Sequence, residues 1–197
     1  MQPLKHKKRL VLVALILLLV GVFVLVWGRG KSVSRLADDL QGDDAKGRRH
    51  AARELAGLGS KAKEAVPALK EALKDPDKRV RYNAAKSLSK VGSDARPATG
   101  ALIDALSDSD SGTRYYAAKT LAKLKLKGED GQAAVPGLIG TLKDSNPRTR
   151  YYAVKCLQDI GAEAKQATAA LREASRDADK DVRQAATGAL KKLERKK

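Results

Sequence analysis

The chain is poor in the residues that most catalytic and metal sites use. Its 197 residues include one cysteine, one tryptophan and two histidines. The single cysteine, Cys156, excludes an intrachain disulfide, and His6 and His50 lie too far apart to suggest an acid–base pair or a zinc site. No glycine-rich phosphate loop, serine elbow or zinc-ligand spacing occurs. The sequence therefore predicts a non-enzymatic protein without cofactor or metal.

What the chain does contain is a repeat. Five arginines stand 33, 33, 36 and 33 residues apart, and the segment around each is similar, as in Arg-Tyr-Tyr-Ala-Ala-Lys-Thr-Leu from residue 114. Self-similarity at this period is typical of a solenoid. The repeat arginines are Arg48, Arg81, Arg114, Arg150 and Arg183.

Each repeat has the apolar spacing of two helices. A leucine follows each repeat arginine by seven residues and another apolar residue follows by ten, as in Leu88 and Val91. A second apolar pair, such as Leu69 and Leu73, precedes the arginine. Spacings of three and four residues place each set on one helix face. We call the two predicted helices of a repeat A and B.

The segments between the helices carry turn and capping residues. Aspartate or asparagine stands four residues before each repeat arginine, where it can cap helix B. Glycines such as Gly92 favour the ends of B helices, and Pro67 and Pro136 favour the starts of A helices. The three extra residues of the longest repeat fall near residues 125–131 and are expected to leave the stack intact.

Two acidic turns, at residues 108–112 and 177–181, resemble calcium loops only superficially. Neither has the closing glutamate at the twelfth position, and both coincide with the helix caps. The position of Cys156 is occupied by Glu54, Ser87 and Thr120 in earlier repeats, which predicts a tolerant, semi-exposed site and not a nucleophile.

The frame Asp-x-x-x-x-Val-Arg-x-x-Ala-Ala-x-x-Leu, found at residues 75–88, resembles the HEAT repeat. It is most similar to the short bacterial kind known as phycobilin-lyase HEAT-like repeats. The resemblance implies an all-α, right-handed superhelix of the armadillo type, with about five two-helix repeats over residues 32–197 and an inner surface formed by B helices. It also implies a structural ladder in which the repeat arginines pair with aspartates of neighbouring repeats, here Asp75, Asp108, Asp144 and Asp177.

The first thirty residues differ from the repeats. Leu10 to Trp27 forms an uncharged apolar run of 18 residues, which as a helix would span about 27 Å, close to the thickness of a bilayer core. We predict a transmembrane helix over residues 10–27, after a basic cytoplasmic segment, 1–9, and before a short linker, 28–31. A cleaved signal peptide is the alternative, although no convincing small-x-small site follows the run.

The basic residues on the two sides of this run predict its orientation. Four precede it, at positions 5, 7, 8 and 9, and three follow, at positions 29, 31 and 35. Basic flanks favour the cytoplasm, so this balance favours an exported repeat domain, tethered close to the membrane by the short linker.

Positive charge dominates the repeats as well. Five of the 40 basic residues lie in positions 1–30, which contain no acid, so the rest of the chain has 35 basic and 23 acidic residues, a net charge of +12. Such a surface favours an acidic protein segment or another polyanion, and anionic lipid headgroups are the nearest polyanion to an anchored domain. The alternative is that scattered lysines only keep the domain soluble.

The basic residues are not all scattered. In the second predicted B helix, helical spacing places Tyr82, Lys86 and Ser89 opposite the apolar face. All five tyrosines occupy the two positions after a repeat arginine, and a basic residue follows four positions after the first. This exposed stripe predicts a binding face, because tyrosine and basic residues are typical of interfaces. The alternative is that the tyrosines cover the seam between B helices. The predicted binding residues are Arg49, Arg53, Tyr82, Lys86, Tyr115, Tyr116, Lys119, Tyr151, Tyr152 and Lys155.

These patterns predict a membrane-anchored scaffold that binds an acidic partner through this face. A bilin-lyase-like enzyme subunit is the alternative that the resemblance implies. Binding of a polyanion such as single-stranded nucleic acid is a third possibility if the repeats face the cytoplasm.

Overall fold

The computed structural model describes residues 32–194. The predicted transmembrane helix over residues 10–27 lies outside this range. Within it, no helix is both long and apolar enough to cross a bilayer. The described residues from Val33 onward form one compact unit.

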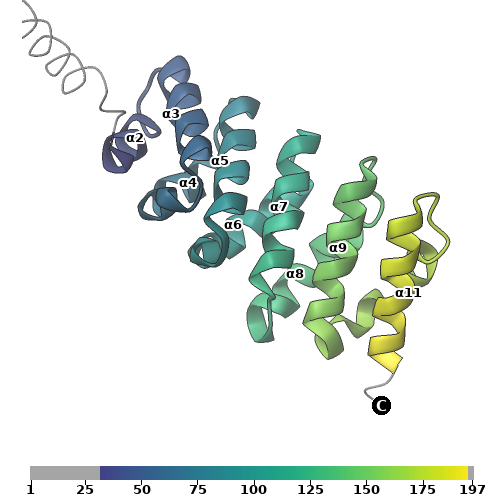
Figure 1. The fold of residues 1–197 in the computed structure, drawn as a ribbon. Coiled ribbons are helices and arrows are strands. Elements are labelled where there is room, and N and C mark those ends of the chain that lie inside the picture. The colour runs from purple at the N-terminus through teal and green to yellow at the C-terminus, as the bar shows by residue number, and fades with distance from the viewer. Residues whose placement is uncertain (1–31, 195–197) are drawn as a thin grey trace, which may run out of the picture. The chain divides into compact units, whose positions relative to one another are not determined.

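The described part is a stack of five helical hairpins, as the repeat predicts (Figure 1). The five B helices are equally regular, with 14 residues in the first four and 15 in the last, and they lie side by side in one layer. They are α3 (Ala45–Leu58), α5 (Lys78–Val91), α7 (Ser111–Leu124), α9 (Pro147–Ile160) and α11 (Lys180–Glu194).

The A layer is less regular, because most A segments are a 3-10 turn followed by a short α-helix. The first A helix is α2 (Val33–Asp39). In the second, third and fifth repeats, the 3-10 segments η1 (Gly59–Ala65), η2 (Gly92–Ala98) and η4 (Gly161–Ala167) precede α4 (Val66–Ala72), α6 (Thr99–Asp104) and α10 (Thr168–Ala174), and η3 (Ala105–Ser107) follows α6. The fourth A helix, α8 (Gly128–Thr141), is continuous.

The predicted capping residues act as expected. The side chains of Asp44, Asp77, Asp110, Asn146 and Asp179 all accept hydrogen bonds from backbone N–H groups in the first turn of a B helix. Gly92 and Gly161 end α5 and α9 with φ of 79°, a backbone conformation in which a side chain would be strained. The turns of the hairpins are thus fixed locally.

The three-residue insertion adjusts the link between the third and fourth repeats. Lys125 ends α7 in the left-handed conformation, and α8 then begins at Gly128, so that α-helix replaces the 3-10 turn found in the second, third and fifth repeats. Pro136 consequently lies inside α8, so its predicted place near the start of an A helix was wrong. Pro67 does stand at the start of α4.

The core is a continuous row of small and branched side chains between the two layers. Four of the five leucines that mark the repeat, Leu55, Leu88, Leu121 and Leu157, are fully buried, and the fifth, Leu190, is partly buried. Burial of each such side chain contributes about 2 kcal/mol. A single hairpin has no partner for its apolar face, so this energy is available only when neighbours stack.

Candidate functional site

The predicted binding residues of the middle three repeats lie together on the B layer. We define the tyrosine–lysine face as Tyr82, Lys86, Tyr115, Tyr116, Lys119, Tyr151, Tyr152 and Lys155. All eight side chains are half-buried, and they come from α5, α7 and α9. Neighbouring B helices bring them into contact although they are about 33 residues apart in the sequence.

The five tyrosine rings form one unbroken chain across three helices. Their order is Tyr82, Tyr116, Tyr115, Tyr152, Tyr151, with centroid separations of 5.5, 4.9, 5.8 and 5.4 Å. Every pair is edge-to-face, a geometry that favourably places the positive edge of one ring on the negative face of the next. The rings therefore hold one another in place.

Lysine ammonium groups lie over this chain of rings. Lys119 Nζ is 5.5 Å from the ring centroid of Tyr115, and 5.9 Å from those of Tyr116 and Tyr152. Lys86 Nζ lies 5.7 Å from the Tyr82 ring. Such cation–π contacts position a charge without neutralising it, so these lysines remain able to attract an anion.

Part of the face also packs, as the alternative interpretation proposed. Tyr116, Tyr151 and Tyr152 contact the hydrophobic core. Burial, with a hydrogen bond to Tyr82, raises the pKa of Tyr116 to about 12, and burial raises the pKa of Tyr152 as well. The rings therefore cover the seam between B helices and present a surface at the same time.

A glycine at the start of α7 makes room for the first ring. A Cβ atom added to Gly112 would lie 2.6 Å from Tyr82 Cδ2 and 2.7 Å from Cε2, closer than carbon atoms approach. The equivalent residues Arg79 and Arg148 of neighbouring repeats have long side chains. The position of Tyr82 against Tyr116 thus depends on Gly112.

The face is hollowed between α9 and α11. An open groove of about 780 Å³ is lined on one side by Tyr151, Tyr152 and Lys155, and on the other by Gln184 and Gly188. In the last repeat, Gln184 and Gly188 replace the tyrosine and lysine of α9, and the short glycine opens the groove. Asp179, Asp181 and Arg148 also line it, so its charge is mixed.

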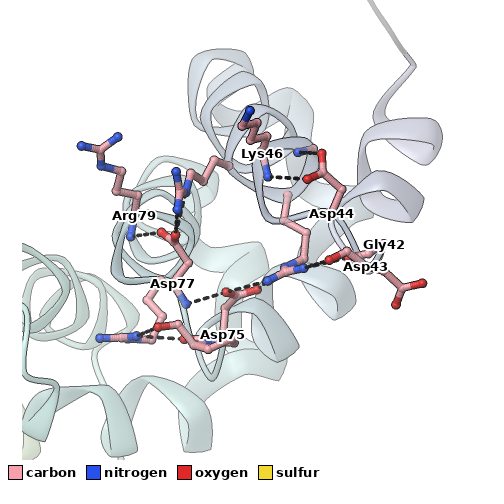
Figure 2. A network of polar contacts seen from close by, with 12 residues as sticks. Gly42, Asp43, Asp44, Lys46, Asp75, Asp77 and Arg79 are labelled. Atoms are coloured by element: carbon pink, nitrogen blue, oxygen red, sulfur yellow. Dashed lines mark hydrogen bonds and ion pairs between the residues drawn. The ribbon is translucent and has the colours of Figure 1, made fainter.

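The two predicted binding residues of the first repeat differ from the others. Arg49 donates through Nε to Asp77 Oδ2 at 2.6 Å, so its charge is paired with the cap of the next B helix (Figure 2). Arg53 is 70% exposed and lies 3.7 Å from Glu54 and 3.4 Å from His50 Nδ1. Among the described residues, the chain of rings ends at Tyr82 and does not reach them.

The repeat arginines lie at the turns and form ion pairs between successive repeats. Arg48 Nε donates to Asp75 at 2.6 Å, and Asp75 in turn accepts the N–H of Asp77 (Figure 2). The equivalent pairs are Arg81 with Asp108 at 2.6 Å, Arg114 with Asp144 at 2.5 Å and Arg150 with Asp177 at 2.7 Å.

Each repeat arginine also donates hydrogen bonds to backbone carbonyls of the turn that precedes its own helix. Arg81 Nη1 donates to the carbonyls of Asp75 and Pro76 at 2.8 and 3.1 Å, and the equivalent Nη1 atoms of the other repeat arginines make the same contacts. The carboxylate partner raises the pKa of Arg48, Arg81, Arg114 and Arg150. These groups are braces, since their charge is satisfied internally.

A second set of lysines also links repeats, and the sequence interpretation missed it. The Nζ atoms of Lys90, Lys123 and Lys192 donate to the carbonyls of Ala56, Ser89 and Gln158 near the end of the preceding B helix, at 2.7, 2.7 and 2.9 Å. All three lysines stand nine residues after a repeat arginine. This fixed spacing could have identified these lysines from the sequence as residues that contact the end of a helix.

Two predicted exposures were wrong. Cys156 is fully buried, and burial raises its pKa to about 12, so the thiol is neither semi-exposed nor activated. The equivalent residues Ser87, Thr120 and Ala189 are buried as well, whereas Glu54, at this position in the first repeat, is exposed. Ser89, expected opposite the core beside Lys86, is 2% exposed because the adjacent B helix covers it. Within residues 32–194, no cluster of histidine, cysteine and acidic residues could hold a metal ion.

Comparisons with known proteins agree with this architecture. Residues 33–99 and 99–191 match the family model for HEAT repeats. No curated protein sequence matches the chain. Computationally designed armadillo repeat proteins for modular peptide recognition are similar in structure, with a TM-score of 0.73, 21% identity and coverage of 82% of both chains.

Two further solved structures are similar. A designed armadillo repeat protein in complex with peptide (KR)4 has a TM-score of 0.71 and 20% identity, with 82% of this chain and 81% of that chain covered. The complex of CpcE and CpcF of phycocyanin lyase from Nostoc sp. PCC7120 has a TM-score of 0.65 and 27% identity, with 85% and 66% covered. Since the family model spans most of the residues and every matched repeat is a helical hairpin, the chain belongs to the HEAT repeat family.

Proposed function

We propose that this protein is a non-enzymatic, membrane-anchored scaffold whose tyrosine–lysine face binds an acidic segment of a partner protein. One observation carries the proposal: five ring-contacting tyrosines from three repeats support lysine ammonium groups over their faces. Aromatic rings fixed in this way lose little conformational entropy on binding, and the lysines attract carboxylates.

The shape and charge of the B layer support an extended ligand. The face crosses three helices, and the groove between α9 and α11 continues it toward the last repeat. The designed armadillo neighbour holds a basic peptide, (KR)4, whereas this face carries Lys86, Lys119 and Lys155. The neighbour therefore supports peptide binding on this fold, and the acidic character of the ligand rests on the charges of this chain.

Binding of a deca-glutamate peptide, measured by isothermal titration calorimetry, tests the proposal. We expect measurable affinity that falls as salt is raised, because the contacts are between exposed charges. Replacing Tyr115 and Tyr151 with alanine, and Lys119 and Lys155 with glutamine, should abolish most of the binding while helicity is retained.

A matched control removes two lysines elsewhere. Lys74 and Lys143 lie exposed in the turns between A and B helices, away from the face. Their replacement by glutamine changes the net charge equally and should leave most of the affinity. Equal losses of affinity in the two variants would show that the interaction depends only on net charge. Loss of helicity in the four-residue variant would show that the face is needed for packing.

The anchor is proposed from the apolar run at residues 10–27. It would hold the repeats near a membrane, where anionic headgroups could compete with a protein ligand. Protease protection of the C-terminal part in intact cells tests the arrangement. If the repeats are exported, added protease should cleave them. Resistance to the protease would place the repeats in the cytoplasm, where polyanions such as nucleic acid would be available as ligands.

A role as a subunit of a bilin lyase is a second candidate. The observation in its favour is the structural similarity to the phycocyanin lyase complex at 27% identity. Chromophore attachment by the purified chain, measured with a bilin and its acceptor protein, would support this role. Cys156 is not available for such chemistry without unfolding, since its side chain is completely buried.

A further inference from the structure

The fifth repeat arginine is oriented like the other four. Arg183 Nη1 donates to the carbonyls of Asp177 and Ala178 at 2.7 and 2.8 Å, which are the same two backbone contacts that hold Arg81 and Arg150. In the earlier repeats, the Nε–Nη2 edge of the guanidinium then meets an aspartate of the next repeat. Among residues 32–194, leaving aside Glu163 and Glu194, whose side chains the structure does not describe, no carboxylate forms an ion pair with Arg183.

A groove adjoins this arginine at the end of the stack. It has a volume of about 450 Å³ and is lined by Ser175, Arg183, Gln184, Thr187, Gly188 and Lys191. Two lining residues are cationic and none is acidic. Ser175 stands where earlier repeats have a leucine, and Gly188 where they have lysine or arginine, so small residues create the space beside the guanidinium.

We propose that Arg183 and this groove bind an aspartate or glutamate side chain of an acidic segment in a partner protein. The geometry is that of the internal pairs, in which Nε and Nη2 both face one carboxylate, as Arg150 does with Asp177 at 2.8 and 2.7 Å. Because the contacts through Nη1 fix the guanidinium beforehand, a ligand need not order it. A two-point contact of this kind selects a planar carboxylate over a neutral amide.

The chain itself offers no equivalent acceptor at its first repeat. The aspartate that accepts each arginine stands six residues before the next repeat arginine, and in the first repeat this position is Gly42. A second copy stacked head to tail would therefore present glycine to Arg183. The occupant we infer is consequently a different protein with an exposed acidic segment.

This site does not depend on the tyrosine–lysine face. The two grooves share Gln184 and Gly188 on α11, but their cationic residues are separate: Arg148 and Lys155 line one groove, and Arg183 and Lys191 line the other. Either site can therefore be removed alone. A ligand long enough to cross Gly188 would reach both.

Arginine Nε–H signals in the NMR spectrum of the full chain test the proposal, with hexa-aspartate as the probe and hexa-asparagine as the neutral control. Hexa-aspartate should shift the Arg183 signal and leave those of Arg81, Arg114 and Arg150 in place, since their carboxylate partners are internal. An Arg183 signal that does not move, or one that moves equally with hexa-asparagine, would overturn the proposal.

Two charge-matched variants separate a specific contact from general attraction. Arg183→Gln should weaken hexa-aspartate binding by about fivefold, whereas Lys74→Gln, which removes one positive charge outside the groove, should change it less than about twofold. Equal losses would contradict the proposal, and melting curves should show both variants folded. Replacing Lys119 and Lys155 with glutamine should leave the Arg183 signal shift intact, so failure of the face and failure of this site are distinguishable.

Discussion

Neighbouring positions on the same helix have opposite roles in this molecule. Arg81 and Arg114 direct their charge to aspartates of the next repeat and to their own turns, with Arg81 only 13% exposed. The side chains one residue later, Tyr82 and Tyr115, lie on the B layer and meet other rings and lysines. Two adjacent positions that recur once per repeat thus form an internal brace at the first position and an accessible surface at the second.

Removing a brace should have the largest effect on stability. Arg81→Ala leaves Asp108, which is 8% exposed, without its partner, and should lower the free energy of unfolding by about 3 kcal/mol. Arg79→Ala, in the same helix with an exposed side chain, should change it by less than about 0.5 kcal/mol. Urea unfolding followed by circular dichroism measures both, and similar values would remove the distinction between brace and surface.

High pH should weaken the face before it affects the braces. The folded state raises the pKa of Tyr116 to about 12, so it favours the neutral ring. Its contribution is present below the ordinary tyrosine pKa of about 10 and is lost as pH rises through the folded value. Tyrosinate absorbance should show late-titrating tyrosines in the folded chain. Titration of all five near the ordinary value would contradict the observed packing.

Low pH should act on the opposite partners. The hydrogen bond from Arg150 lowers the pKa of Asp177, and that from Arg49 lowers the pKa of Asp77. A lowered pKa stabilises the folded state above the unfolded value of about 3.9, and this stability is lost as pH falls through the folded value. Unfolding free energies should therefore be nearly constant just above that range and decline below it. A decline centred near neutral pH would implicate other groups.

Among the ion pairs between repeats, the smallest effect is expected for the exposed pair at the edge of the first repeat. Arg49 is 40% exposed, so solvent screens its interaction with Asp77. Arg49→Gln should reduce the free energy of unfolding by about 0.5 kcal/mol, well below the effect of Arg81→Ala. A loss of unfolding free energy as large as that of Arg81→Ala would show that side-chain exposure does not distinguish weak ion pairs from strong ones.

The sequence predicted the features that recur once per repeat. Leu88 and Leu121 at helical spacing, and Asp77 and Asp110 before each B helix, were sufficient for the hairpins and the caps. The pairing of Arg81 with Asp108 was implied by the resemblance to HEAT repeats. Each depends on a local pattern copied at a fixed period, and the period brings the copies into register.

Features created by contact between repeats were harder to predict. The burial of Cys156 and Ser89 results from an adjacent B helix, and a single-helix projection does not include that neighbour. Pro136 was misplaced because the insertion lengthens α8 toward its N-terminal end. The sequence indicated where the tyrosines lie, but their ring chain requires both the register of three helices and the space above Gly112.

The claim that the tyrosine–lysine face is a binding surface and not a structural brace is tested most directly by comparing the affinities of Lys119→Gln and Lys143→Gln for deca-glutamate. Lys119 lies over three tyrosine rings, while Lys143 is exposed beyond the end of α8. We predict that Lys119→Gln weakens binding severalfold with unchanged unfolding free energy and that Lys143→Gln has little effect on either. Equal affinities, or a loss of stability in Lys119→Gln that accounts for the weaker binding, would contradict the account.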